Sequence, residues 1–300
     1  MTDTPSIPVP PAPSAPAHGH FRGLRELLWM LAARNLKIRY KGSALGFFWS
    51  LLTPLAMIVI YALFAGLLGL RRALLGLDGA TFDYLPFLVT GIVVWQFTVG
   101  SLTDSLNAIV GNANLVKKVY FPRIILPAST VAANTVNFLL TFLILLLYLA
   151  LTGALRLGPS TLWLLPALAL HLLLCLGIAL IVSTLNVFFR DTEHIVGLLV
   201  LAWFFLSPIM YETNLQLTAA APRLPASLLG LIYLNPMTGL LALYRRALLG
   251  MDLTPAIPGA DPAAVLSPCW ILLSLLSALI LLAIGLRALH LGNRHLGDVL

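Results

Sequence analysis

Charge is scarce in this chain of 300 residues: only 10% of them are Asp, Glu, Lys or Arg, whereas 60% are hydrophobic. Soluble domains carry charge on roughly a quarter of their residues, so the composition excludes an ordinary soluble protein and indicates an integral membrane protein. Cysteine is also rare, because only Cys175 and Cys269 occur, far apart and in or beside apolar stretches. We interpret them as small buried residues and predict no disulfide and no metal site.

Signatures of catalysis and nucleotide binding are missing as well. The sequence contains no G-x-x-x-x-G-K-[ST] motif, so the chain is not expected to hold ATP through a P-loop. It also contains no H-E-x-x-H, no G-x-S-x-G and no Cys/His cluster at metal-ligand spacing. His171 lies well inside an apolar stretch, and such a residue more often faces the interior of a helical bundle than acts as a catalyst. We therefore predict no catalytic residue, no bound metal and no cofactor for this chain.

Long apolar stretches dominate what is present. A membrane-spanning helix needs about 20 apolar residues, and six stretches approach or exceed that length without any Asp, Glu, Lys or Arg. These are Ala44–Leu70, Leu85–Thr103, Ile124–Thr152, Leu162–Phe189, Ile195–Tyr211 and Pro268–Leu286. The predicted fold is an all-α integral membrane protein with six transmembrane helices. Because ionisable groups inside the membrane usually build ion and proton relays, a chain without them is expected to be the membrane subunit of a machine powered from elsewhere.

The sequence also predicts an orientation. Residues 1–20 are rich in Pro and Ala and are expected to form a disordered tail, and they lack the features of a signal peptide. With the amino terminus in the cytoplasm, twelve of the 18 Lys and Arg fall in cytoplasmic segments and six outside. This distribution follows the positive-inside rule, which explains the net charge of +7 without a nucleic-acid partner. A multi-pass protein with both termini in the cytoplasm is predicted.

The segment 21–43 precedes the six-span domain 44–300 and is predicted to hold an amphipathic helix. At 100° per residue, six apolar residues between Phe21 and Ile38 share one arc: Phe21, Leu24, Leu27, Leu28, Leu31 and Ile38. Trp29 and Leu36 break the pattern on the polar side. A basic amphipathic helix of this kind is expected to lie flat in the cytoplasmic membrane interface, as an anchor or with a further role.

The apolar segment Leu228–Leu243 admits two interpretations. It could be a seventh span, which would place the carboxyl terminus outside. However, Asn235-Pro236 lies in its middle, where proline removes a helix hydrogen bond, and each half of about eight residues is too short to cross. We predict a re-entrant pair of half-helices in the outer leaflet, covered by protein.

The basic segment Ser105–Val119 lies between the second and third predicted spans. It can form a short helix with one apolar side and with Lys117 and Lys118 charged. This helix could be an ordinary cytoplasmic loop that obeys the charge rule, or it could dock into a soluble partner through its apolar area and its lysines. The spacing does not decide between these interpretations.

Four stretches of this sequence resemble the membrane subunits of ABC exporters for polysaccharides, which are the permeases for O-antigen, capsular polysaccharide and teichoic acid. The stretches are Arg39–Leu55 (RYKGSALGFFWSLLTPL), Asn112–Pro127 with KKVYFPR, Asn186–Asp191 (NVFFRD) and Leu234–Thr238 (LNPMT). They occur in the order and spacing of that family. The similarity extends from about Leu27 to the carboxyl terminus.

The resemblance implies a half-transporter in a bacterial inner membrane. Two copies of the permease would form a channel for a lipid-linked polysaccharide, and two copies of a separate P-loop ATPase, with its ATP and Mg, would power export to the periplasm. The residues expected to couple to the ATPase are Asn112, Asn114, Lys117, Lys118, Tyr120, Arg123, Arg190 and Asp191. Arg39, Lys41 and Gly42 would lie where a pyrophosphate-linked head group enters, and Asn235 and Pro236 would mark the periplasmic gate.

A sugar chain needs a smooth path to which it adheres weakly. Aromatic faces suit this task, and Phe47, Phe48, Trp49 and Trp95 are the candidates for the channel wall. Most aromatic residues in membrane proteins instead face lipid or form interfacial belts.

Two other functions remain open. An ABC permease for a drug or a small lipid would share the fold and the energy source, but it would leave the four stretches unexplained. A membrane scaffold without transport would show no ATPase activity on co-expression with a P-loop partner.

Overall fold

The computed structural model describes residues 17–40, 48–49, 52–53, 55–57, 59–60, 63, 84–119, 121–211, 234–251 and 267–293. Within these residues the chain is helical and has no strand, which confirms the predicted all-α class. The helices are α1 (Ala17–Tyr40), α4 (Tyr84–Leu106), η2 (Val110–Asn112), α5 (Ala113–Lys118), α6 (Ile125–Leu151), η3 (Pro159–Trp163), α7 (Leu164–Phe188), α8 (Thr192–Leu206), α11 (Pro236–Leu249) and α12 (Ser267–Gly292).

Four of the described stretches are long and apolar enough to cross a membrane: α4, α6, η3 with α7, and α12. Each corresponds to a predicted span, with ends that differ by a few residues. The fifth predicted stretch, Ile195–Tyr211, contains only the 15-residue α8. At 1.5 Å per residue α8 is about 22 Å long, shorter than the roughly 30 Å hydrocarbon core. Most of the first predicted span, Ala44–Leu70, lies outside the described residues.

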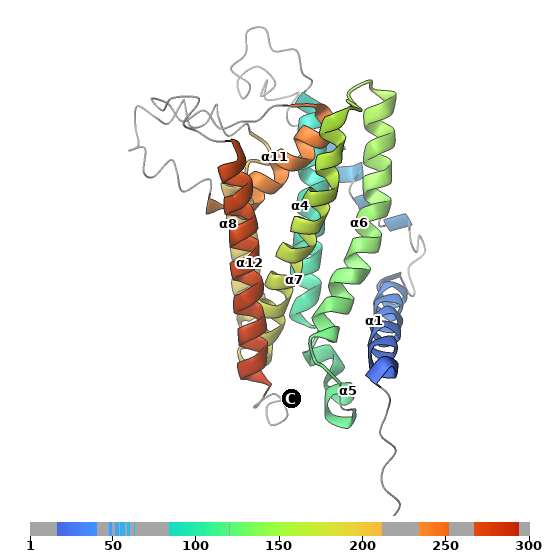
Figure 1. The fold of residues 1–300 in the computed structure, drawn as a ribbon, viewed down its shortest axis with the longest axis vertical. Helices are drawn as coiled ribbons and strands as arrows, with labels where there is room; N and C mark the ends of the chain where they lie inside the picture. Colours follow the sequence, from blue (N-terminus) through green and yellow to red (C-terminus); the bar gives the residue numbers. More distant parts are fainter. Residues whose placement is uncertain are drawn as a thin grey trace, which may run out of the picture.

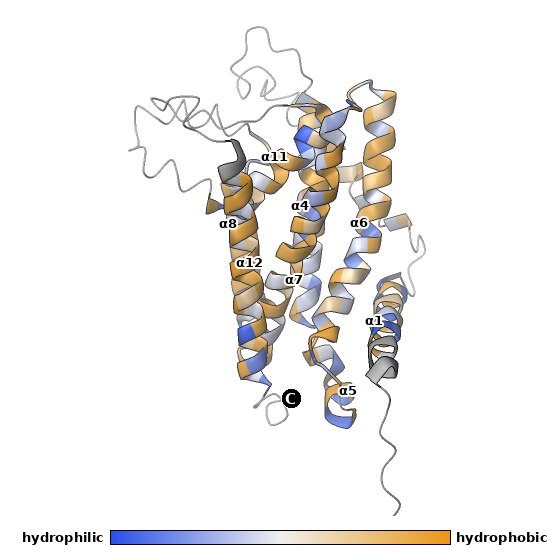
Figure 2. Cartoon of the chain, viewed as in Figure 1, coloured by the Kyte–Doolittle hydropathy of each residue, from blue (hydrophilic) through white to orange (hydrophobic). Residues whose placement is uncertain are grey.

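The long helices stand side by side and alternate in direction. Figure 1 shows α4, α7 and α12 running downward and α6 and α8 running upward, with α5 at one end and α11 at the other. We call these the α5 end and the α11 end. Hydrophilic colour gathers in α5 and at the lower end of α12 in Figure 2, so the α5 end is polar.

Helices α7 and α12 meet with almost no space between their backbones. A Cβ on Gly177 would lie 2.7 Å from the backbone nitrogen of Leu282, and one on Gly285 would lie 2.7 Å from the carbonyl oxygen of Gly177. Because no side chain fits at such distances, these two glycines permit the close approach. This kind of small-residue packing is common between membrane helices, where burial from water drives no association.

Helix α1 packs lengthwise along the lower part of α6 (Figure 1). Leu31 and Ala32 of α1 are buried there. The helix begins at Ala17, before the predicted Phe21. Ile38, which also belongs to the predicted apolar arc, does not pack there, because its side chain is 60% exposed. Arg39 points at α4, so Ile38, about 100° around the helix, is turned away from the bundle.

Helix α11 corrects one part of the re-entrant prediction. Pro236 does break the segment, because Asn235 is extended (φ −70°, ψ 116°) and the helix starts directly after it. The second half is longer than the predicted eight residues, since α11 has 14. Proline in the first helical position loses no hydrogen bond, and the helix continues to Gly250, whose φ of 64° ends it. The first half, before Leu234, lies outside the described residues.

Candidate functional site

The loop between α4 and α6 forms a compact helical corner at the α5 end. Val116 is buried and belongs to one hydrophobic cluster with Ile109 and residues of α1, α6, α7 and α12, so the short α5 joins the bundle through its one apolar side. Lys117 and Lys118, on its last turn, are exposed, as is Asn114. The predicted helix within Ser105–Val119 is therefore present, as the end of α4 followed by η2 and α5.

Asn112 ties this corner to α1. Its side-chain oxygen accepts a hydrogen bond from the Arg34 guanidinium. Its amide nitrogen donates to the carbonyl oxygen of Ala108 at 2.8 Å. A single side chain thus bonds to its own loop and also to α1.

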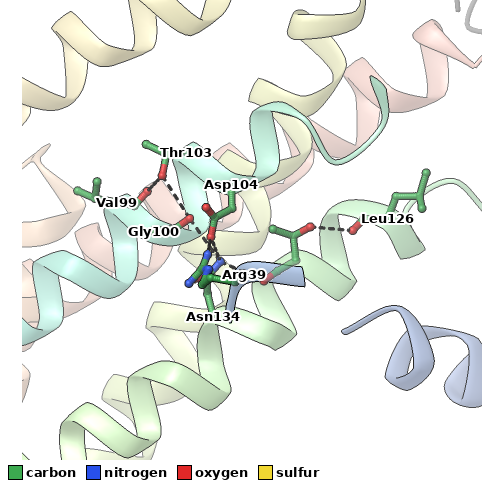
Figure 3. A network of polar contacts seen from close by, with 8 residues as sticks. Arg39, Val99, Gly100, Thr103, Asp104, Leu126 and Asn134 are labelled. Carbon is green, nitrogen blue, oxygen red and sulfur yellow. Dashed lines mark hydrogen bonds and ion pairs between the residues drawn. The ribbon is translucent and has the colours of Figure 1, made fainter. Parts of the chain in front are cut away.

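A second polar cluster lies higher on α1, where it meets α4 and α6 (Figure 3). Arg39 forms an ion pair with Asp104 of α4 and donates to the side-chain oxygen of Asn134 of α6 at 3.1 Å. Asn134 in turn donates to Asp104 at 2.7 Å and to the carbonyl oxygen of Gly100 at 3.3 Å. The Arg39 and Asp104 side chains are 37% and 35% exposed, so the cluster lies at the surface of the described part of the protein and not in its core. The sequence singled out Arg39 but missed Asn134.

The other predicted coupling residues lie at the same end of the molecule. Arg190 and Asp191, in the turn between α7 and α8, are exposed. Arg123, before α6, donates to the carbonyl oxygen of Asn293 at 2.8 Å and so connects the corner to the end of α12. The structure thus brings Asn112, Asn114, Lys117, Lys118, Arg123, Arg190 and Asp191 to one end. Tyr120 lies outside the described residues.

At the α11 end, Asn235 joins two helices through its side chain. Its oxygen accepts from the backbone nitrogen of Met237 at 3.0 Å, which caps α11, and from the indole nitrogen of Trp203 at 2.9 Å. Its amide nitrogen donates to the carbonyl oxygen of Leu206 at 3.1 Å and to the Ser207 hydroxyl at 3.0 Å. The predicted gate residue therefore connects the start of α11 to the end of α8.

Arg245 of α11 is a residue that the sequence reading counted only as an outer charge. Its side chain is buried, with 2% exposed. The guanidinium donates to the carbonyl oxygens of Pro208 at 2.7 Å and Ile209 at 2.8 Å, and it lies 3.3 Å over the Phe87 ring. Gly91 leaves room for it, because a Cβ there would lie 2.8 Å from the guanidinium.

The centre of the bundle is polar only locally. His171 is fully buried, as predicted, with its ring nitrogens 2.8 Å from the Thr98 hydroxyl and 3.3 Å from the Tyr244 hydroxyl. The rings of Phe97 and Phe138 pack against it. Because both ring nitrogens have hydrogen-bond partners and the ring is packed on aromatic side chains, His171 is a residue of the protein core.

The predicted channel and head-group residues are only partly described. Trp95 is 7% exposed, and its ring packs against Trp203 and Phe204 of α8. Phe48 and Trp49 are 69% and 47% exposed. Phe47, Lys41 and Gly42 lie outside the described residues. Among the residues that the structure describes, no three His, Cys, Asp or Glu come close enough together to hold a metal ion.

Comparison with known proteins gives concordant results. The sequence profile of the ABC-2 type transporter family matches residues 26–249. An "O-antigen export system permease protein RfbA" of Klebsiella pneumoniae is 33% identical over 223 residues, which is 74% of this chain and 80% of that protein. A protein with the same name from Myxococcus xanthus is 31% identical over 247 residues, 81% of this chain and 86% of the relative.

Proposed function

This chain belongs to the ABC-2 type transporter family, and it is a transporter permease and not the catalytic ATPase. We propose that it is the channel-forming subunit of an ATP-driven exporter for a lipid-linked, O-antigen-like polysaccharide. In this proposal two copies of the permease and two copies of a P-loop ABC ATPase form the transporter. The exporter lies in a bacterial inner membrane and moves the glycan from cytoplasm to periplasm.

The observation that carries the proposal is the extent of the similarity to an O-antigen export permease. That relative is matched over 80% of its length at 33% identity. The family profile matches residues 26–249, which include most of α1, the corner at the α5 end and α11. The four sequence stretches that resemble polysaccharide exporters all lie within this range.

The distribution of charge supports the α5 end as the cytoplasmic one. Most Lys and Arg side chains described by the structure lie there, whereas Arg156, Arg245 and Arg246 lie toward the α11 end. The positive-inside rule then places the α5 end in the cytoplasm, with both chain termini on that side. The α11 end would face the periplasm, where Asn235 and Pro236 would belong to the gate.

The ATPase would dock on the α5 end. Lys117, Lys118, Arg190 and Asp191 are exposed there, on a folded surface in which Val116 is buried and Asn112 is bonded to Arg34. Exposed charges on a folded surface suit the orientation of a partner. Because Arg34 of α1 is bonded to Asn112 of the corner, α1 would follow when the ATPase displaces the corner.

The anionic head group of the substrate would enter beside Arg39, together with Lys41 and Gly42. Arg39 is already paired with Asp104, but it is 37% exposed and its guanidinium has five N–H donors. A pyrophosphate could therefore contact this side chain on its open side. Phe47, Phe48 and Trp49 remain the candidates for aromatic contacts with the glycan, whereas Trp95 is buried against α8.

Transport in reconstituted vesicles tests the proposal. Export of a lipid-linked glycan should require both ATP and the partner ATPase. It should persist when an uncoupler collapses the proton gradient at constant ATP, because the spans offer no evident proton relay. Export that stops with the uncoupler, or that proceeds without the ATPase, would identify a secondary carrier and refute the proposal.

A further inference from the structure

The exposure of residues on helix α4 changes halfway along its length. From Pro86 to Trp95, toward the α11 end, every residue is buried. From Gln96 toward the α5 end, one face opens: Gln96 and Gly100 are partly exposed, and Thr103 and Asn107 are exposed. Gln96, Gly100 and Thr103 lie within about 60° of one another around the helix, and Asn107 follows in the same direction.

Gln96 is close to the middle of the membrane. It is near the midpoint of a helix that runs from Tyr84 to Leu106, so about 15 Å of helix separates it from the α5 end. No hydrogen bond reaches its side-chain amide from any residue that the structure describes. By contrast, the Thr103 hydroxyl donates to the carbonyl oxygen of Val99 at 2.9 Å.

This face does not suit lipid. An amide without a hydrogen-bond partner in hydrocarbon costs several kcal/mol, and polar groups in membrane spans usually face a protein interior or a water-filled cavity. The same molecule shows what a lipid-facing surface looks like. On α6, the residues Leu139, Leu143 and Leu147 are spaced four apart and are 49%, 63% and 59% exposed.

The open face ends at Gln96. Ile92 and Val89 continue the same side of α4 toward the α11 end, and they are only 2% and 1% exposed. On this side of α4 the protein is therefore open below Gln96 and closed above it. Gly91, one turn above on the buried part, packs against Ile209 and Arg245, which hold the closed half together.

We propose that Gln96, Thr103 and Asn107, with Gly100 at the edge against Asn134 of α6, line a water-filled vestibule that opens at the α5 end and ends at Gln96. The inference rests on the proposed function, and the occupant is water and then the hydroxyl-rich glycan. The Gln96 amide offers two donors and an acceptor, which match sugar hydroxyls. In the proposed transporter with two permease copies, the second copy would complete the vestibule.

Cysteine labelling tests the vestibule without any need for transport. In a chain carrying Cys175→Ala and Cys269→Ala, Gln96→Cys and Thr103→Cys are made singly, with Leu143→Cys on α6 as the matched control. The variants are produced with the ATPase in inverted membrane vesicles and treated with a charged, membrane-impermeant thiol reagent. Only a hydrated cysteine ionises to the reactive thiolate, so positions 96 and 103 should react at least tenfold faster than position 143.

Two results would overturn the vestibule: position 96 reacts no faster than position 143, or two copies cross-link through position 96 without labelling. The last would mean dry packing between protomers. The outcome is separable from the proposed function. Normal ATP-dependent export with an unlabelled position 96 refutes the vestibule alone, whereas fast labelling in vesicles that export no glycan refutes the function alone.

Discussion

Arg39, at the α5 end, and Arg245, at the α11 end, both make several polar contacts, but in different surroundings. Arg39 pairs with the side chains of Asp104 and Asn134 and is 37% exposed. Arg245 bonds to the backbone carbonyls of Pro208 and Ile209 and is 2% exposed. An exposed pair between side chains can rearrange at little cost, whereas a buried cation bound to carbonyls leaves them unpaired when it moves. The comparison indicates an adjustable α5 end and a fixed α11 end.

The largest effect should come from removing the buried arginine. Arg245→Leu takes away the donors of two buried carbonyls, each worth about 1–3 kcal/mol when left unsatisfied, so a loss of about 3 kcal/mol or more is expected. Denaturant unfolding of the purified protein in detergent measures it. The matched control is the neighbouring Arg246→Leu, where the half-buried guanidinium lies 5.4 Å over the Trp163 ring and about 1 kcal/mol is at stake. Equal losses at 245 and 246 would contradict a special role for the buried position.

The α5 end, which the comparison indicates is adjustable, is also the end proposed to bind the ATPase. Reversing charges at the α5 end and at the α11 end tests whether only the α5 end binds it. Lys117→Glu with Lys118→Glu should leave the permease inserted but weaken its complex with the ATPase by about 2–3 kcal/mol, roughly 30- to 150-fold in Kd, since opposed like charges are costly at an interface. Co-purification and a titration of ATPase binding measure it. Arg156→Glu, an exposed cation at the other end, should change nothing. Normal ATPase binding and normal export in the double variant would show that α5 does not contribute to ATPase binding.

Asn235 should give an intermediate effect, which extends the comparison to a second residue of the fixed end. Asn235→Ala removes the cap of α11 and the partners of Trp203 and Ser207, and it should destabilise the protein by about 1–2 kcal/mol. Asn235→Asp keeps the acceptor oxygen for Met237 and Trp203 but loses the donor to Leu206, so about half the loss is expected. Unfolding in detergent measures both, and Asn114→Ala, an exposed asparagine at the α5 end, is the control. An equal loss in the Asn114 variant would show that the two ends do not differ.

The sequence predicted the long helices well because their signal is local. Helices α6 and α12 are continuous apolar runs, and a run of that length has one stable form in a membrane. Helix α11 was predicted less well. Proline was placed in the middle of a segment, but it stands at the start of a helix, where its missing N–H costs nothing. Hydropathy does not show where a helix begins relative to its proline.

Arg245 and Asn134 could not be found from the sequence because their partners are remote. The carbonyls that bind Arg245 belong to Pro208 and Ile209, and any residue could supply a carbonyl oxygen at those positions. Arg39 was expected near the head-group site, but nothing local in the sequence indicated that it pairs with Asp104. Their contact depends on α1 packing lengthwise along α6, which brings two residues 65 positions apart together.

The smallest effect, and the sharpest test of the adjustable end, concerns the Arg39–Asp104 pair. Because both side chains are more than a third exposed, Asp104→Asn should cost no more than about 1 kcal/mol in unfolding experiments. Any loss should shrink in high salt, since salt screens exposed charges. The exchange Arg39→Asp with Asp104→Arg should recover most of what either single change loses, because the attraction is restored in reverse. Asn134 would then donate to the exchanged carboxylate from its present place on α6.

If Asp104→Asn instead destabilised the protein as strongly as Arg245→Leu, with no dependence on salt, the α5 end would be as fixed as the α11 end. A movable α1 would then lose its physical basis.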